Sequence, residues 1–387
     1  MTLTRRGALR RLAAGGAASL GLPGLARAQA ATHTLRIGVA QPAVGQPPSI
    51  AGSSMAIAHA KGWIDEAFQP DGVKVEWLFF KGAGPAVNEA LTTGQLDFAF
   101  QGDLPAIVAR SAGLKTRLIL ATGVRSNIYI GVPPDSRPRT PRAGLRPARP
   151  PRGSRKLGAA RRFLEKTVAD LRGKRVSLFR GTNMHLPALR LLEAHGLAEK
   201  DLKILNLDTA GYLAALSTRD IDAAIGAMDI LRLRDKGQVR VLYASKGDSP
   251  VFTRQSHVLV TDAYAAAHPQ HVQRLVDAAV RTARWSSDEA NREEVLRLWA
   301  RAGTPYEHWK EDYAGEPLRV RLNPNFDPFL VARYKDAEAQ AYRFKLGRKR
   351  FDVDGWIDTR YLQASLRQQG LQNYWPVYQA DGKALGA

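Results

Sequence analysis

The sequence predicts an α/β protein of two similar lobes, each built on a mostly parallel sheet flanked by helices. Short runs rich in β-branched and aromatic residues alternate with helical segments, at a spacing typical of parallel sheets. This alternation occurs twice, on either side of a segment rich in proline and arginine. The chain has 387 residues, which is enough for two domains or one large two-lobed unit.

The first series of elements comes before the Pro/Arg-rich segment. We expect strands at 35–39, 73–80, 96–100 and 117–122, and helices at 53–61, 85–91 and 105–112. Gly62 and Gly113 follow two of these helices, and glycine is common just after a helix end. Pro85 stands at a first helical position, where proline is tolerated. These elements predict one sheet with its helices.

The second series predicts the other lobe. We expect strands at 175–179, 202–207, 221–225 and 239–244, and a helix over 186–194. Two extended segments, 127–132 and 256–260, flank this series and are natural places for the chain to pass between lobes. The predicted division is therefore 29–126 with 256–387 for lobe 1, and 127–255 for lobe 2.

The C-terminal part of the chain is mostly helical in this interpretation. A helix begins at His268 and Pro269, and its apolar residues recur on one face. Ser287 is expected to cap a further helix that runs through Trp299 and ends at Gly303.

Two ten-residue segments resemble each other across the lobes. Residues 90–99 read ALTTGQLDFA, and residues 215–224 read ALSTRDIDAA. Each reads as a helix end, a tight turn and a strand that starts near an aspartate. Convergence on a common helix–turn–strand unit would explain this, but we favour two lobes of similar design.

The N-terminus predicts export. Arg5 and Arg6 precede an uncharged apolar run over 12–22, and Ala26-Arg27-Ala28 offers a cleavage site. We expect residues 1–28 to be a removable signal peptide of the twin-arginine type, with an ordinary Sec signal as the alternative. No other run approaches the length of a membrane span. The expected location of the mature protein is the periplasm.

Composition excludes several kinds of site. The chain has no cysteine, so it cannot form a thiolate metal site, an iron–sulfur cluster or a lipoprotein anchor. We find no G-x-S-x-G elbow and no H-E-x-x-H pair, and the glycine-containing stretch 82–87 lacks the third glycine of a dinucleotide fingerprint. No cofactor, metal or catalytic residue is expected.

The net charge of +21 is concentrated in two segments. One is the predicted signal peptide, and the other is 133–162, which carries ten basic residues and one acid. A nucleic-acid-binding surface would interleave basic and aromatic residues on a folded face, so no nucleic-acid partner is expected. Few apolar residues occur in 133–162, which predicts a disordered insertion, with a basic arm that docks an acidic partner as the alternative.

Several motifs, in order, resemble those of a known group. They are GQLDFA at 94–99, QGDLP at 101–105, VADLRGKRV at 168–176, GTNMH at 181–185 and FDVDGWI at 351–357. Together they resemble the periplasmic substrate-binding proteins for aliphatic sulfonates, which stand with the nitrate, taurine and thiamine-precursor binders of ABC importers. The resemblance covers nearly all of 35–362 and departs from the family at 133–162.

The resemblance implies a type II periplasmic-binding-protein fold, with a ligand cleft between the lobes. It implies a monomeric, non-enzymatic receptor that closes on a small organic anion and presents it to an ABC permease in the inner membrane. An aliphatic sulfonate is the expected ligand, and nitrate, taurine or a thiamine precursor are alternatives. Two other classes stay open, namely an enzyme of thiamine-pyrimidine synthesis with this fold and a periplasmic sensory module.

The expected anion site is the start of the helix after Gly181-Thr182-Asn183, where backbone and side-chain donors converge. These residues could instead only cap the helix, and His185 could either donate to the ligand or pack beside the loop. Across the cleft, Gln101 and Gly102 follow a strand at its C-terminal end, where ligands bind in open sheets. Asp103 would repel an anion, so we expect it to cap its helix. The full candidate set for ligand binding is Ser53, Ser54, Gln101, Gly102, Gly181, Thr182, Asn183, His185 and Asp229.

Overall fold

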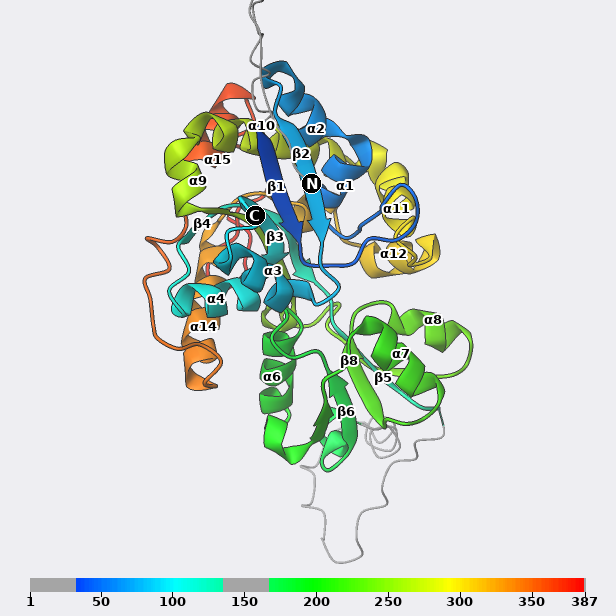
Figure 1. Ribbon diagram of the computed structural model, residues 1–387. Coiled ribbons are helices and arrows are strands. Elements are labelled where there is room, and N and C mark those ends of the chain that lie inside the picture. The colour runs from blue at the N-terminus through cyan, green and yellow to red at the C-terminus, as the bar shows by residue number, and fades with distance from the viewer. Residues whose placement is uncertain (1–32, 135–166, 386–387) are drawn as a thin grey trace, which may run out of the picture. The chain divides into compact units, whose positions relative to one another are not determined.

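The computed structural model describes residues 33–134 and 167–385 (Figure 1). The predicted signal peptide and all but the first two residues of the segment 133–162 lie outside the described residues. The described chain contains two five-stranded sheets. The first sheet has the order β2-β1-β3-β10-β4, with β1 at Thr34–Val39, β2 at Lys74–Phe79, β3 at Phe98–Gly102, β4 at Thr116–Ser126 and β10 at Arg254–Thr261.

The second sheet repeats the arrangement of the first. Its order is β7-β6-β8-β5-β9, with β5 at Tyr129–Val132, β6 at Arg175–Leu178, β7 at Lys203–Leu205, β8 at Ala223–Gly226 and β9 at Arg240–Ala244. In the first sheet β2, β1 and β3 pair in parallel, and β10 lies between β3 and β4. In the second sheet β7, β6 and β8 pair in parallel, and β5 lies between β8 and β9. The two lobes therefore share one topology.

The sheets are mixed, which refines the expectation of mostly parallel strands. Strand β10 pairs antiparallel with β3 and β4, and β5 pairs antiparallel with β8 and β9. These two strands enter directly from the other lobe: β4 ends at Ser126 and β5 begins at Tyr129, whereas the return runs between Ala244 and Arg254. Each begins beside the end of a parallel strand, since Ser256 pairs with Gly102 at the end of β3 and Tyr129 pairs with Gly226 at the end of β8, so each runs in the opposite direction.

Helices cover the sheets of both lobes (Figure 1). Those that follow β6, β7 and β8 are α6 (His185–Ala194), α7 (Thr209–Ser217) and α8 (Ile230–Asp235). The helices of the rest of the described chain are α1 (Ser54–Lys61), α2 (Trp63–Phe68), α3 (Ala83–Thr92), α4 (Asp103–Ser111), α9 (Asp262–Ala267), α10 (Pro269–Ser286), α11 (Arg292–Ala300), α12 (Tyr306–Tyr313), α13 (Leu318–Arg321), α14 (Pro328–Arg343) and α15 (Arg360–Gln368). Among the described residues, no helix is both long enough and apolar enough to cross a membrane.

Helix α10 confirms the periodicity of its sequence. The apolar residues on its predicted face are fully buried, namely Val272, Leu275, Val276, Ala279 and Val280. They pack in the largest hydrophobic cluster of the described chain, together with residues of β1 and α1. The amphipathic pattern therefore places α10 against the first sheet.

The expectation for Ser287 is wrong. Ser287 follows the last residue of α10, and its hydroxyl donates to the carbonyl of Ala283 and accepts the indole N–H of Trp375. Asp288 is the N-cap instead, accepting the N–H of Ala290 at the start of a short 3₁₀ turn, and α11 begins only at Arg292. The hydroxyl of Ser287 is engaged by the preceding helix and by a distant tryptophan, so it does not cap the next helix.

The two resembling segments occupy the same position in each lobe. In the first, Asp97 stands just before β3 and accepts hydrogen bonds from the backbone and the guanidinium of Arg36 on β1. In the second, Asp222 stands just before β8 and makes the same contacts with Arg175 on β6. The resemblance thus reflects an equivalent anchor between the first and third strands of each sheet.

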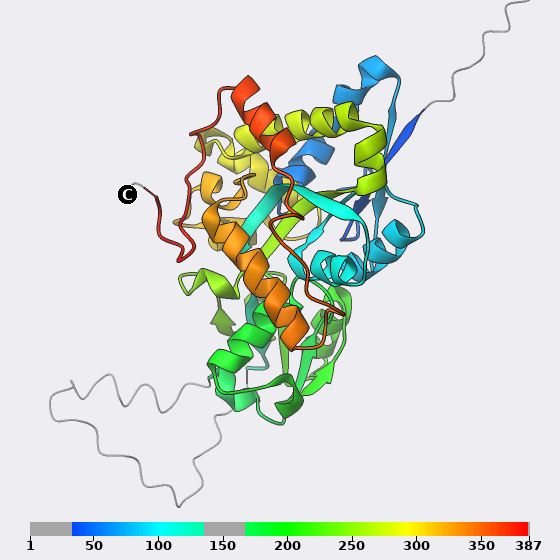
Figure 2. The same cartoon turned by 90° about the vertical axis from the view of Figure 1, so that its left-hand side faces the viewer.

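One long helix joins the lobes. The described residues belong to one compact unit, and α14 contacts both α4 and α6 (Figure 2). From α6, the guanidinium of Arg190 donates to Asp336 at 2.8 Å and to Gln340 at 2.8 Å, both on α14. This partly buried contact ties the middle of α6 to α14.

Candidate functional site

Three small residues form a row across the first sheet. In the register, Ser256 on β10 pairs with Gly102 on β3 and with Gly123 on β4. Neighbouring strands lie about 4.8 Å apart, so the row is about 10 Å long. The glycines have no side chain, and the half-buried Ser256 hydroxyl makes no hydrogen bond to a described residue. The two glycines let neighbouring segments approach the sheet closely, and the Ser256 hydroxyl between them is a polar group that a ligand can contact.

The start of helix α1 lies beside one end of this row. A β-carbon placed on Gly123 would lie 3.0 Å from the carbonyl oxygen of Gly52 and 3.6 Å from the β-carbon of Ser53. The Ser53 hydroxyl accepts the N–H of Ala56 at 3.1 Å, and Ser54 donates to the carbonyl of Thr122 at 3.3 Å. Ser53 therefore caps α1, whereas Ser54 holds the helix against β4, and the positive end of the helix dipole faces the row.

Helix α4 begins at the other end of the row, directly after β3. Gly102 is its N-cap, and the carboxylate of Asp103 accepts the N–H of Leu104 at 2.8 Å. Asp103 is thus one residue inside the helix rather than at the cap, although it still satisfies a first-turn N–H. Burial raises the pKa of Asp103 to about 6, and the positive charges of Arg190 and Arg254 oppose that rise.

Asn183 of lobe 2 lies directly over Gly102 of lobe 1. A β-carbon on Gly102 would stand 2.2 Å from the β-carbon of Asn183, so only glycine fits there while the lobes are in this arrangement. Gly181 has φ +75°, and a β-carbon placed on it would lie 3.3 Å from the Cγ atom of Pro85 at the start of α3. The Asn183 amide makes no hydrogen bond to a described residue, so its donors are available to a ligand.

The other two polar side chains of this loop are occupied within lobe 2. Thr182 donates to the carbonyl of Phe179 at 2.8 Å and accepts the N–H of Met184 at 3.2 Å. The Nδ1 atom of His185 accepts the N–H of Gly181 at 3.2 Å, and its Nε2 atom lies 3.6 Å from Glu199. Burial lowers the pKa of His185, although Glu199 opposes this. A neutral ring that accepts at Nδ1 carries its proton on Nε2, toward Glu199.

Gln101 points away from the row. Successive strand residues face opposite sides of a sheet, and the amide nitrogen of Gln101 donates to Asn88 of α3 at 3.2 Å. Its buried amide oxygen has no hydrogen-bond partner within 33–134 and 167–385 and lies 3.3 Å from where a β-carbon on Gly84 would be. These contacts support the start of α3, the segment that meets Gly181. A direct contact between Gln101 and a ligand remains a prediction.

Asp229 links the two lobes. It precedes α8 without capping it, and its carboxylate accepts the hydroxyl of Thr304 at 3.0 Å. Thr304 lies between α11 and α12, so this bond joins lobe 2 to the helices that follow β10. The sequence left two roles open for Asp229, capping or holding a ligand ammonium group; its contact with Thr304 is a third.

Arg254 is the residue that sequence reasoning missed. It lies on β10 two residues before Ser256, and therefore about 7 Å away on the same face of the sheet. Its Nε and Nη2 atoms donate to the carbonyl of Asn127 at 3.3 and 3.1 Å, and its Nη1 atom has no hydrogen-bond partner among the described residues. Burial lowers its pKa, which Asp312 and Asp229 oppose, but a guanidinium keeps its proton in proteins.

The nearby acid Asp312 does not neutralise Arg254, because it has its own cation. Its buried carboxylate forms an ion pair with Arg321 at 2.7 Å and accepts hydrogen bonds from Asn127 and Tyr129. Burial alone would raise the pKa of Asp312, but Arg321 and these hydrogen bonds hold it below its ordinary value. Arg254 thus places a guanidinium between the lobes, with the carboxylates of Asp312 and Asp229 both close enough to raise its pKa. With so many arginines in the chain, nothing in the sequence singles this one out.

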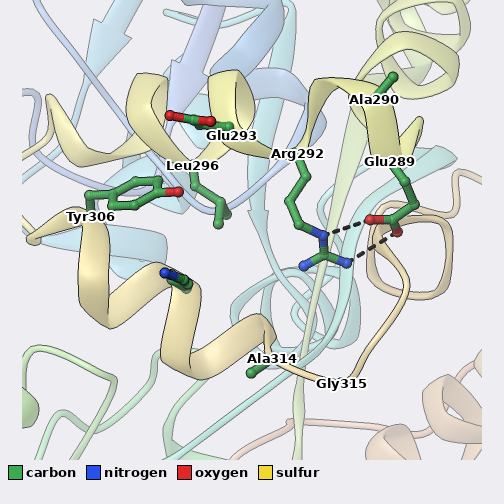
Figure 3. A pocket seen from close by; sticks show the side chains of 9 residues that line it. Glu289, Ala290, Arg292, Glu293, Leu296, Tyr306, Ala314 and Gly315 are labelled. Atoms are coloured by element: carbon green, nitrogen blue, oxygen red, sulfur yellow. Dashed lines mark hydrogen bonds and ion pairs between the residues drawn. The ribbon is translucent and has the colours of Figure 1, made fainter.

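A pocket elsewhere in the structure is a poor candidate for an anion. It has a volume of about 520 Å³ and lies between α11 and α12 (Figure 3). Its wall includes Glu289 and Glu293, and the guanidinium of Arg292 is already paired with Glu289. None of the predicted ligand-binding residues lines this pocket.

Comparisons with known proteins support the expected relationship. Residues 165–290, less than half of the chain, match the NMT1/THI5-like family. Over 326 residues the chain is 23% identical to a protein of Bacillus subtilis (strain 168) whose name describes an aliphatic sulfonates-binding protein, covering 82% of this chain and 86% of that relative.

Solved structures show the fold. The periplasmic sulfonate-binding protein SsuA of Methylobacillus flagellatus KT is 25% identical, with a TM-score of 0.73 over 90% of this chain and 98% of that one. The desulfurization enzyme DszB is 18% identical, with a TM-score of 0.62 over 87% of this chain and 99% of that one. The expected two-lobed fold is confirmed, and the same fold also occurs in an enzyme.

Proposed function

Because this chain is a relative of the aliphatic sulfonate-binding proteins and has their two-lobed fold, we propose that it is the extracytoplasmic receptor of an ABC importer. Its ligand is a small organic anion, an aliphatic sulfonate. The anionic group binds on the row Gly102–Ser256–Gly123, between the two lobes.

Arg254 is the observation that carries this proposal. A sulfonate needs a counter-charge and several donors, and a guanidinium can offer parallel N–H groups to two oxygens of one anion. Within the part of the chain that the structure describes, the Nη1 atom of Arg254 and the hydroxyl of Ser256 on the same face are both unpaired. The starts of α1 and α4 add oriented N–H groups at the two ends of the row.

The lobes close on the ligand because the groups that contact it come from both lobes. Arg254 and Ser256 belong to the first sheet, whereas Asn183 comes from the loop before α6. An anion that touches both sides stabilises the closed arrangement by its extra contacts there, which shifts the population toward closure. The closed surface is what the membrane permease recognises.

The chain binds its ligand without changing it. The enzyme DszB shares only the fold with this chain, at 18% identity. Thiol chemistry is unavailable because the chain has no cysteine. In this proposal the protein is exported, loses its signal peptide, acts as a monomer in the periplasm and hands the anion to an inner-membrane permease.

Calorimetric titration of the mature protein tests this function. We expect ethanesulfonate or butanesulfonate to bind more tightly than nitrate, sulfate or taurine. Arg254→Gln should weaken sulfonate binding by about 10- to 100-fold, because a hydrogen bond to a charged group contributes about 1.5–3 kcal/mol. Arg297→Gln is the matched control, since Arg297 pairs with Glu293 of the same helix at the exposed surface, and the variant should bind as tightly as the parent.

Two results would contradict the proposal. One is that no sulfonate raises the melting temperature or gives a heat of binding at millimolar concentration. The other is that a correctly folded Arg254→Gln variant binds the sulfonate as tightly as the parent protein does.

A further inference from the structure

Three histidines from distant parts of the sequence meet at one end of the first sheet. His33 precedes β1, His268 lies between α9 and α10, and His271 is in the first turn of α10. One ring nitrogen from each lies within 4.8 Å of the other two. The rings of His268 and His271 are stacked with centroids 5.0 Å apart, and the His33 ring lies 4.7 and 5.2 Å from them.

Tyr264 orients two of these rings. Its hydroxyl lies 3.0 Å from Nε2 of His33 and 2.9 Å from Nδ1 of His271. A hydroxyl has one proton, so one of these nitrogens accepts it while the other donates its own N–H to the oxygen. The Tyr264 ring packs edge-on against the buried Phe98. Histidines that bind metals commonly have such a partner, which holds the ring in place.

A metal binds the deprotonated nitrogen of a neutral ring. Each of the three imidazoles would therefore ligate through a ring nitrogen that carries no proton.

We propose that His33, His268 and His271 form a binding site for a d-block divalent cation, with Zn²⁺ as the best match. Three imidazoles suit Zn²⁺, Cu²⁺, Ni²⁺ or Co²⁺, whereas Mg²⁺ and Ca²⁺ take oxygen ligands. Tetrahedral Zn²⁺ with bonds of 2.0–2.1 Å needs nitrogens about 3.4 Å apart. The three nitrogens lie within 4.8 Å of one another, so the side chains of these half-buried residues would rotate on binding to reach that spacing, and water would complete the coordination.

The bound cation would cross-link two parts of the fold, which we call the metal clip. The cation would tie the segment before β1 to the junction of α9 and α10, two regions joined there by side chains alone. It would stabilise the native state by mass action, since the three ligands come together only in the folded chain. This site is separate from the row that includes Gly102 and Ser256, so its test does not depend on the ligand of that row.

The test uses the mature protein, purified without a histidine tag and treated with EDTA, which is then removed. Titration with ZnCl₂ should show one ion bound per chain and raise the melting temperature, whereas MgCl₂ should not. Substitution with CoCl₂ should give the visible absorption of a low-symmetry Co²⁺ site. Absence of saturable Zn²⁺ binding would overturn the proposal.

Variants separate a three-histidine site from incidental binding. His33→Gln, His268→Gln and His271→Gln should each weaken Zn²⁺ binding about tenfold or more, while keeping the parent's melting temperature in EDTA. His195→Gln is the control, because His195 is exposed and lies outside the cluster, and it should bind Zn²⁺ like the parent. If His33→Gln also binds like the parent, Zn²⁺ binds only the His268–His271 pair and the proposed clip does not exist.

Discussion

Asp103 shows how burial sets the charge of a single residue beside the candidate site. Its carboxyl group is 2% exposed, and burial raises its pKa from an ordinary value near 3.8 to about 6. The protein keeps this acid although it lies at the helix start that faces the row. Its hydrogen bond to the N–H of Leu104 explains the retention, because a protonated or an ionised carboxyl can both accept it.

Asp103→Asn should stabilise the ligand-free protein at neutral pH. The folded-state pKa is above the unfolded one, so between about pH 4 and pH 6 the folded state holds more protons. The free energy of unfolding therefore falls as pH rises through this window. A shift from 3.8 to about 6 corresponds to about 3 kcal/mol. Urea unfolding should show no difference between variant and parent at pH 4 and a gain of this order at pH 7; parallel pH profiles would contradict it.

At the scale of elements, the site depends on how close the loop before α6 comes to the junction of β3 and α4. The backbone of Gly102 has φ −84° and ψ 170°, an extended conformation that any residue can adopt. Its lack of a side chain is needed only because Asn183 of the other lobe lies against it. Gly102 is thus a requirement of lobe closure rather than of the local fold.

Gly102→Ala should weaken sulfonate binding without lowering the melting temperature of the ligand-free protein. The added methyl group would meet the β-carbon of Asn183 at 2.2 Å, so the lobes cannot reach this arrangement. Replacing Asn183 by Gly removes that β-carbon, and the double variant should bind no worse than Asn183→Gly alone. Equal affinities of Gly102→Ala and the parent would show that the ligand does not require this contact.

At the scale of the whole molecule, the same arginine–aspartate contact occurs in both lobes, but its aspartate is more buried in the first lobe than in the second. Arg36 and Asp97 hold the first sheet as Arg175 and Asp222 hold the second. The side chain of Asp97 is 10% exposed, whereas that of Asp222 is 38% exposed. Water can replace a lost acceptor at the second anchor more easily than at the first.

Asp97→Ala should therefore destabilise the protein more than Asp222→Ala. The first removes the acceptor of the Arg36 backbone N–H and of its Nε and Nη2 atoms in a partly buried place, although Nη1 keeps the carbonyl of Gly94. Leaving such donors unsatisfied costs about 1–3 kcal/mol. The second removes a solvent-exposed contact and should cost less than about 1 kcal/mol. Chemical denaturation of the two variants checks the order, and equal losses would contradict the argument from burial.

Local patterns in the sequence determined much of the fold. Hydrophobic periodicity predicted α10 and its buried face, the alternation of strands and helices predicted two α/β lobes, and the resembling segments before β3 and β8 predicted their common design. These features follow from residues a few positions apart, which is the distance over which propensity, capping and periodicity act. The order of the motifs also predicted the relationship to the sulfonate-binding proteins.

Tertiary structure decided what depends on residues distant in the chain. It inserted β5 and β10 antiparallel, because each enters directly from the other lobe, and it gave the hydroxyl of Ser287 to Trp375. It placed Asn183 on Gly102 and set Arg254 between the lobes. The positions of such groups are set by packing between the lobes, and no local pattern in the sequence encodes that packing.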